Sequence, residues 1–250
     1  MESLTVTEVW PILTNIPGSE VAIFCHEHFV NTLKANESFK AGDYGKALTE
    51  TFIAMDGKMK ELEKQDRRTY QFSDAGCTAN VVLVTDKKIY CANAGDSRSV
   101  LSSGGKAIQL SEDHKPDSED EKNRIEKAGG YVMGGRTNGV LSLSRAIGDF
   151  DYKDLSKDPK DHIITALPDI TVNDITPETE FIICACDGIW DCLTPQESVD
   201  KVKERLGKVD LKKNVEDLLD SIIAEDVGSS GGIGCDNMTC FIIQFDKTSQ

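Results

Sequence analysis

Three aspartates stand where a predicted strand meets a loop, and their side chains are well placed to do chemistry. Asp187 follows the apolar run 181–186, Asp96 lies in Ala94-Gly-Asp-Ser-Arg98, and Asp236 separates a glycine-rich stretch from another apolar run. Side chains at strand ends can converge on one rim of a sheet. Carboxylates without histidine or thiolate partners favour hard cations, so we expect magnesium or manganese rather than zinc. Such ions could activate water for hydrolysis and neutralise phosphate oxygens.

Taken singly, an Asp-Gly pair more often marks a turn than a metal site, so the elements that position the aspartates matter. The periodicity predicts helices over 18–34 and 43–64, the second with Asp43 as its cap. Their apolar stripes are expected at Val21, Phe24, Cys25, His28 and Thr32, and at Leu48, Phe52, Met55, Met59 and Leu62.

Short β-rich runs follow at 79–85, 88–94 and 97–102, and their spacing predicts an antiparallel meander. Gly104-Gly105 makes the next turn, before a run at 106–110. A charged helix over 119–128 is expected to end at Gly129-Gly130, because glycine adopts the left-handed conformation easily.

The second half of the chain predicts strands at 170–173, 181–186 and 238–245. Thr194-Pro-Gln-Glu197 has the pattern of a capping box with proline in the first turn. Helices are therefore expected over 195–206 and 212–226, followed by a flexible loop at 228–234. Neither a repeat nor a linker interrupts the pattern, which favours one domain.

Eight cysteines raise the question of disulfides or zinc, but half of them lie in apolar strand-like runs, namely Cys91, Cys184, Cys186 and Cys240. A reduced cysteine there behaves as a small hydrophobic side chain. Cys184 and Cys186 would share one strand face and could bind zinc, yet no second pair with matching spacing supports that. We expect these cysteines to belong to the core.

The composition limits the function classes. With 250 residues, 39% of them hydrophobic, the chain can bury a substantial core, and its formal charge of −15 argues against nucleic acid as a partner. No apolar run of ~18 residues predicts a membrane span. The first residues lack the basic flank and cleavage site of a signal peptide. We therefore expect a monomer in the cytoplasm or nucleus.

Seven motifs, in the same order, resemble the metal-dependent protein phosphatases (PPM type), which are specific for serine and threonine. The motifs are Gly76-Cys-Thr-Ala79, Ala94-Gly-Asp-Ser-Arg98, Asp113-His-Lys-Pro116, Arg124-Ile-Glu-Lys-Ala-Gly-Gly130, Leu143-Ser-Arg-Ala-Ile-Gly-Asp-Phe150, Cys186-Asp-Gly-Ile-Trp-Asp191 and Cys235-Asp-Asn-Met-Thr239. The resemblance implies an α+β fold, a sandwich of two antiparallel β-sheets flanked by α-helices. It also implies phosphoserine and phosphothreonine proteins as substrates.

The resemblance carries over residue by residue to the aspartates. Asp187 and Asp236 match family aspartates that bind a catalytic metal, magnesium or manganese. Asp96 and Asp191 match acids that hold an additional, weaker ion together with Asp187. The stretches 113–116 and 148–150 match segments that look structural or border the family's flap, so no catalytic role is assigned to them.

The sequence departs from the family at its beginning. The family opens with a strand bearing a phosphate-binding arginine and a Glu-Asp pair, then a strand ending in Asp-Gly-His-Gly-Gly, whereas Thr14-Asn-Ile-Pro17 stands here in place of the Asp-Gly-His. We therefore interpret residues 1–17 as a divergent segment and 18–246 as an incomplete phosphatase domain, with the amino-terminal strands missing or replaced. His26 and His28 point to different faces of their helix and are poor substitutes for the missing ligands.

These departures leave alternative functions open. One pair of aspartates supplies fewer than half of the ~6 ligands of a hard cation, so weak metal binding is expected. The chain is either a phosphatase that uses metal-activated water, or a catalytically inactive phosphatase-like binding module, or a truncated gene product.

Overall fold

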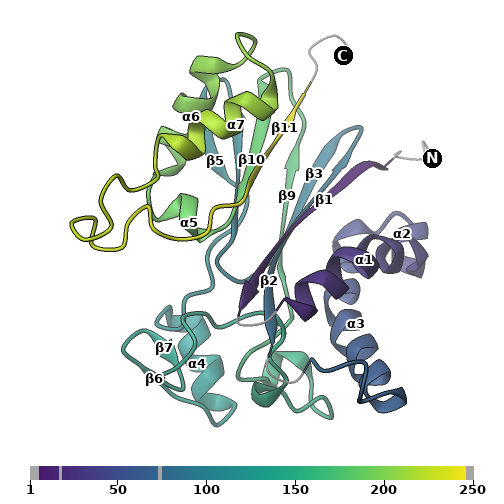
Figure 1. The fold of residues 1–250 in the computed structure, drawn as a ribbon. Coiled ribbons are helices and arrows are strands. Elements are labelled where there is room, and N and C mark those ends of the chain that lie inside the picture. The colour runs from purple at the N-terminus through teal and green to yellow at the C-terminus, as the bar shows by residue number, and fades with distance from the viewer. Residues whose placement is uncertain (1–5, 17–18, 73–74, 246–250) are drawn as a thin grey trace.

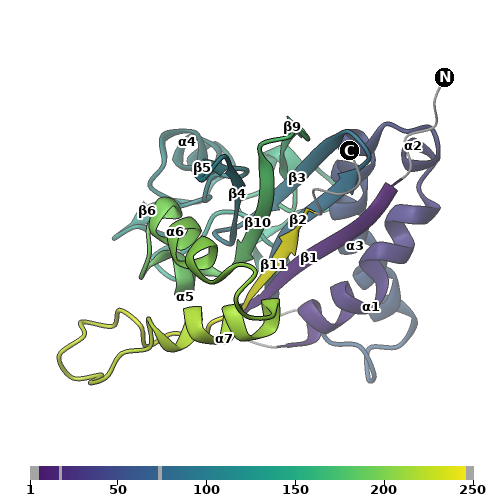
Figure 2. The same ribbon diagram turned by 90° about the horizontal axis from the view of Figure 1, so that it is seen from above.

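The computed structural model describes residues 6–16, 19–72 and 75–245. Two antiparallel sheets pack face to face with helices outside each, so the fold has four layers (Figures 1 and 2). The first sheet has the order β1-β2-β3-β9 with β8 paired to β2, and comprises β1 (Val6–Ile16), β2 (Gly76–Thr85), β3 (Lys88–Ala94), β8 (Ile147–Gly148) and β9 (Asp169–Asp174). The second has the order β11-β10-β4-β5 and comprises β4 (Arg98–Ser103), β5 (Lys106–Gln109), β10 (Thr179–Ala185) and β11 (Cys240–Gln244). The predicted α+β sandwich is confirmed.

Helices cover the outer faces of the two sheets. Figure 2 shows three of them beside the first sheet, α1 (Glu20–Ala35), α2 (Glu37–Lys40) and α3 (Tyr44–Gln65), and two beside the second, α6 (Pro195–Arg205) and α7 (Leu211–Asp220). The remaining elements are α4 (Glu119–Lys127), α5 (Asp187–Trp190), β6 (Val132–Met133), β7 (Arg136–Thr137) and the 3-10 helices η1 (Phe150–Tyr152) and η2 (Pro159–Asp161). Within the described ranges, no helix combines the length and apolar character that a membrane span needs.

Strand β2 is buried along its whole length because both of its faces are covered. On one face, Val81 and Leu83 pack in the same cluster as Phe52 of α3. On the other face, Val82 packs in a cluster with Ile182 of the second sheet. Successive side chains of a strand point to opposite faces, so β2 contributes alternately to the helix-facing core and to the core between the sheets.

The apolar stripes of the first helices were predicted with unequal success. In α3, Leu48, Phe52, Met55 and Met59 are buried, and the Asp43 side chain accepts a hydrogen bond from the Lys46 N–H at 3.3 Å, as a cap. In α1, however, Phe29 and Leu33 are buried, whereas His28 is exposed. The true stripe of α1 is thus shifted by one residue after Cys25, because the larger apolar side chains take the core positions.

The expected antiparallel meander is wrong at its third strand. Strand β3 pairs with β2 and β9, whereas β4 pairs with β5 and β10 in the other sheet. The chain crosses between the sheets at Gly95, whose φ of +126° suits glycine and whose missing side chain leaves room for Thr78. A local β pattern does not distinguish a hairpin from such a crossing. The correction places Asp96 on the segment that joins the two sheets.

Strand β1 lies at the edge of the first sheet, where the amino-terminal strands were expected to be missing or replaced. It pairs antiparallel with β2 over most of its length, from Val6 opposite Thr85 to Ile16 opposite Gly76. The ring of Trp10 lies 5.8 Å from that of Phe241 in β11, so the edge strands of the two sheets contact each other. Residues 6–16 therefore form an integral strand of the first sheet.

The carboxy-terminal half agrees with the prediction except in one helix. The capping box of α6 is present, with both Thr194 and Glu197 making their reciprocal bonds. Helix α7 ends at Asp220 rather than near residue 226, and the Ala224 N–H instead donates to the Gly234 carbonyl at 3.0 Å. A loop-closing bond thus replaces the last predicted helical turns.

The cysteines behave as predicted. All eight are free thiols, and Cys91, Cys184 and Cys186 are buried, with Cys240 partly so. Burial raises the pKa of Cys91 and of Cys240 to about 12, which keeps both protonated.

Candidate functional site

The pairing of β4 with β10 brings Asp96 and Asp187 to the same end of the second sheet. Ala185 stands opposite Arg98 in this antiparallel register. Asp187 comes two residues after Ala185, and Asp96 comes two residues before Arg98. The two aspartates therefore leave the sheet together. Asp96 is buried, and Asp187 is partly exposed.

Asp236 reaches this rim through a close backbone approach at Gly188. A Cβ built at Gly188 would lie 2.5 Å from the carbonyl oxygen of Asn237 and 3.4 Å from the Cβ of Asp236. Cys186 fastens the same loop, because its thiol donates to the Asn237 carbonyl at 3.4 Å and its N–H donates to the Thr239 carbonyl at 3.1 Å. Gly188 is thus needed for close packing of the two aspartate-bearing segments.

Asp187 begins the short helix α5, and Asp191 directly follows its last residue. The Asp191 N–H donates to the Asp187 carbonyl at 2.8 Å, and residues four apart lie on one helix face. Burial, together with the negative charges of Asp96 and Asp236, raises the pKa of Asp187 to about 6. Asp191 contributes in the same direction. The four predicted carboxylates are therefore close enough for each of the others to act on Asp187.

Lys115 is a site residue that the sequence analysis missed. Its ammonium donates to the Asp96 carboxylate at 2.6 Å. Burial by itself would lower the pKa of Lys115, but the charges of Asp96, Asp113 and Asp187 outweigh that effect and raise it. Asp96 and Lys115 are 19 positions apart, and only the fold brings them together, so local spacing carried no signal for this pair.

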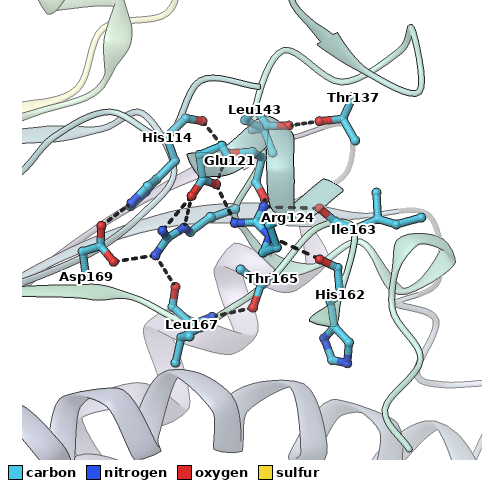
Figure 3. Close-up of polar contacts among 12 residues, drawn as sticks. His114, Glu121, Arg124, Thr137, Leu143, His162, Ile163, Thr165, Leu167 and Asp169 are labelled. Atoms are coloured by element: carbon cyan, nitrogen blue, oxygen red, sulfur yellow. Dashed lines mark hydrogen bonds and ion pairs between the residues drawn. The ribbon is translucent and has the colours of Figure 1, made fainter. Parts of the chain in front are cut away.

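A buried ionic network supports the segment that carries Lys115 (Figure 3). At its centre Glu121 accepts from Arg124 at 2.6 Å, from Arg145 at 2.7 Å, and from the Ser144 hydroxyl. Burial opposes ionisation of Glu121, but hydrogen bonds and charge from Arg145 and Arg124 lower its pKa to about 2. The Ser144 N–H donates to the carbonyl of His114 at 3.2 Å, which ties the network to the residue beside Lys115.

Thr14 lies near the end of β1 and next to the turn that carries Asp96. Its hydroxyl oxygen lies 3.4 Å from that of Ser97, which lies 3.2 Å from that of Thr78. Ser97 directly follows Asp96. A neutral hydroxyl thus stands at the position where the family pattern has an aspartate.

The donor set fits a hard cation in its chemistry. Three carboxylates act on Asp187, and the mutual repulsion of the four is the condition that a bound cation relieves. Across the described residues, no group of three or more His, Cys, Asp and Glu side chains is arranged tightly enough to hold a metal ion. Asp187 and Asp236 are therefore candidate ligands of a cation.

Comparisons with known proteins find relatives of this chain. The family model described as Protein phosphatase 2C matches residues 7–231. "Probable protein phosphatase 2C 6" of Paramecium tetraurelia is 48% identical over 236 residues, which cover 91% of this chain and 79% of that protein. "Protein phosphatase 2C homolog 2" of Hypocrea jecorina is 47% identical over 230 residues, covering 91% of this chain and 51% of that protein.

Solved structures agree in fold. A phosphatase from Toxoplasma gondii superposes with a TM-score of 0.78 at 20% identity, covering 96% of this chain and 85% of that one. A sex-determining protein of C. elegans superposes with a TM-score of 0.75 at 24% identity, covering 94% of this chain and 55% of that one. At these identities the likeness concerns the fold alone.

Proposed function

Because this chain belongs to the protein phosphatase 2C family, we propose that it is a protein serine/threonine phosphatase that depends on magnesium or manganese. Its substrates are phosphoserine and phosphothreonine residues in proteins. The observation that carries the proposal is the packing of Gly188 against the loop of Asn237, which brings Asp187 and Asp236 together. Asp96 and Asp191 add two more carboxylates that act on Asp187.

Each residue of the site has a distinct task. Asp187 and Asp236 would hold the cation, and Asp96 and Asp191 would contribute further negative charge. A bound divalent cation would neutralise phosphate oxygens and acidify a water molecule. The Gly188 N–H donates to the Asp187 carboxylate at 3.0 Å and fixes its orientation. The Asn237 N–H does the same for Asp236 at 2.7 Å.

The test is hydrolysis of a phosphothreonine peptide with and without manganese. Wild type should release phosphate in a manganese-stimulated manner, and Asp187→Asn should abolish the release. Asp120→Asn, an exposed carboxylate on α4, is the matched control and should behave as wild type. Wild-type turnover no greater than that of Asp187→Asn would reject the proposal.

A second candidate is a phosphatase-like binding module without turnover. It is favoured by the hydroxyl of Thr14, which lies beside Ser97 where a metal-binding carboxylate would complete the site. Such a module would bind a phosphopeptide equally well with and without chelator and release no phosphate. Phosphopeptide binding that is lost on chelation would favour the enzyme instead.

We further propose that the protein is a monomer of the cytoplasm or nucleus. Its eight free thiols, five of them buried, support a reducing compartment. Light scattering on the purified protein tests the oligomeric state. Microscopy of a fluorescent fusion tests the location, and a secreted fusion would contradict it.

A further inference from the structure

The ion pair between Lys115 and Asp96 differs from the surface ion pairs of this protein. Its Nζ–Oδ2 distance is 2.6 Å, and the Asp96 side chain is only 8% exposed. By comparison, Lys122 and Glu126 on α4 lie 3.9 Å apart, and about half of each side chain is exposed. Exposed ion pairs like that of Lys122 and Glu126 contribute little to stability. The Lys115 ammonium, in contrast, neutralises a buried carboxylate.

The neighbours of Lys115 hold its backbone in place. On one side, Asp113 accepts two hydrogen bonds of 2.9 Å from the guanidinium of Arg98. On the other, the His114 N–H donates to the Gly95 carbonyl at 3.0 Å, and the Gly95 N–H donates to His114 Nδ1 at 3.1 Å. Gly95 directly precedes Asp96. The ammonium is therefore delivered to Asp96 by a segment that is tied to the same turn.

The two partners differ in their freedom to move. Lys115 is 39% exposed and ends a flexible four-carbon stem, whereas Asp96 is buried on the turn that joins the two sheets. An ammonium makes single-point contacts that exchange readily. A competing cation would therefore displace the lysine, and Asp96 would stay in place.

We propose that Lys115 is a built-in cation that occupies Asp96 while no divalent ion is bound and that must be displaced before Asp96 contacts such an ion. This inference rests on the proposed magnesium or manganese site. It implies that Lys115 weakens divalent-ion binding and sets the ion concentration at which Asp96 takes part. The pair also stabilises the ion-free rim, because one positive charge offsets part of the repulsion among four carboxylates.

The test is a direct measurement of manganese binding by calorimetry and by electron paramagnetic resonance. Lys115→Met removes the charge and keeps an apolar stem, so it should bind manganese about tenfold more tightly than wild type, since a unit positive charge near the ion is lost. Lys115→Arg keeps the charge and should not show that gain. Lys122→Met, which breaks the exposed pair on α4, is the control and should match wild type.

The outcomes separate this inference from the proposed function, because ion binding is read without turnover. Tighter manganese binding by Lys115→Met supports the inference even if no variant hydrolyses phosphopeptide. Unchanged or weaker manganese binding by Lys115→Met and by Lys115→Gln overturns it, provided that both variants unfold cooperatively. Unchanged manganese binding with weaker binding of inorganic phosphate would also overturn it and assign Lys115 to the phosphate instead.

Discussion

Gly188 packs against the backbone carbonyl of Asn237 so closely that a methyl group on its α-carbon would stand 2.5 Å from the oxygen. The obstacle is a backbone atom, which cannot swing aside as a long side chain can. The spacing between the Asp187 and Asp236 segments is therefore set by the absence of a side chain at position 188.

Replacing this glycine should separate the two aspartates. We expect Gly188→Ala to weaken manganese binding at least tenfold and to destabilise the fold by about 1–3 kcal/mol, the usual cost of overpacking. Calorimetry and urea unfolding measure the two effects. Gly57→Ala is the matched control, because nothing lies within 4 Å of its built Cβ in helix α3, and alanine there should stabilise by up to about 1 kcal/mol. Equal effects of the two substitutions would contradict the packing argument.

Removing the charge of Asp187 should stabilise the metal-free protein. Burial and the charges of Asp96 and Asp236 raise its pKa to about 6, so the folded state binds the proton more tightly than the unfolded one. The resulting destabilisation is fully present above pH 6 and fades as the pH falls towards the ordinary carboxylate value.

We therefore expect Asp187→Asn to raise the free energy of unfolding by about 1–2 kcal/mol at pH 7.5 in chelator, after allowance for solvent screening. The gain should shrink towards pH 4, and the stabilisation by added manganese should be lost. Urea unfolding at the two pH values, with and without manganese, measures both. A destabilised variant at pH 7.5 would show that carboxylate repulsion is not the dominant effect.

Restoring a carboxylate at position 14 should strengthen the metal site. The Thr14 hydroxyl lies 3.4 Å from that of Ser97, beside Asp96. We expect Thr14→Asp to bind manganese at least about tenfold more tightly, because one more oxygen anion joins an under-coordinated hard cation. Thr14→Asn is the matched neutral control. Equal affinities of the two variants would place residue 14 outside the reach of the ion.

The Glu121 network should make the free energy of unfolding fall in acid. Arg145 and Arg124 lower the pKa of Glu121 to about 2 although burial opposes this. A depressed carboxyl pKa contributes stability that is present above the unfolded value and is lost as the pH falls through the folded one.

Breaking the network should cost most where Glu121 is ionised. We expect Glu121→Gln to lower the free energy of unfolding by about 3–5 kcal/mol above pH 5, as for a buried ion pair deprived of one partner. This difference from wild type should become smaller between pH 4.5 and 2. Glu119→Gln changes an exposed residue of the same helix and should leave the free energy of unfolding nearly unchanged at any pH. A pH-independent difference would mean that packing, not charge, explains the Glu121 result.

Local signals were predicted well from the sequence. The capping box of Thr194 and Glu197 and the cap at Asp43 are confirmed, because each depends on residues within one helical turn. Side-chain periodicity located the stripe of α3 for the same reason. In α1 it misplaced the stripe, because the helical spacing also fits His28. The structure exposes His28 and buries the neighbouring Phe29.

Relationships across the chain were harder to predict. The aspartates were expected to converge, and the raised pKa of Asp187 reflects that they do; their role as metal ligands stays a prediction. The crossing at Gly95 and the pairing of Lys115 with Asp96 were missed. Both depend on which sheet β4 joins. Strand β4 joins the second sheet by pairing with β10, which lies far along the chain.

The partnership of β4 with β10 also bears on how the protein is made. The two strands are about 80 positions apart, and ribosomes add roughly 5–20 residues per second. The edge of β4 that pairs with β10 therefore stays unpaired for several seconds during synthesis. Only its opposite edge is paired, with β5. Over that interval Val100 and Leu101, buried in the finished fold, are open to wrong pairing, and a chaperone that binds short apolar segments would find its natural target there.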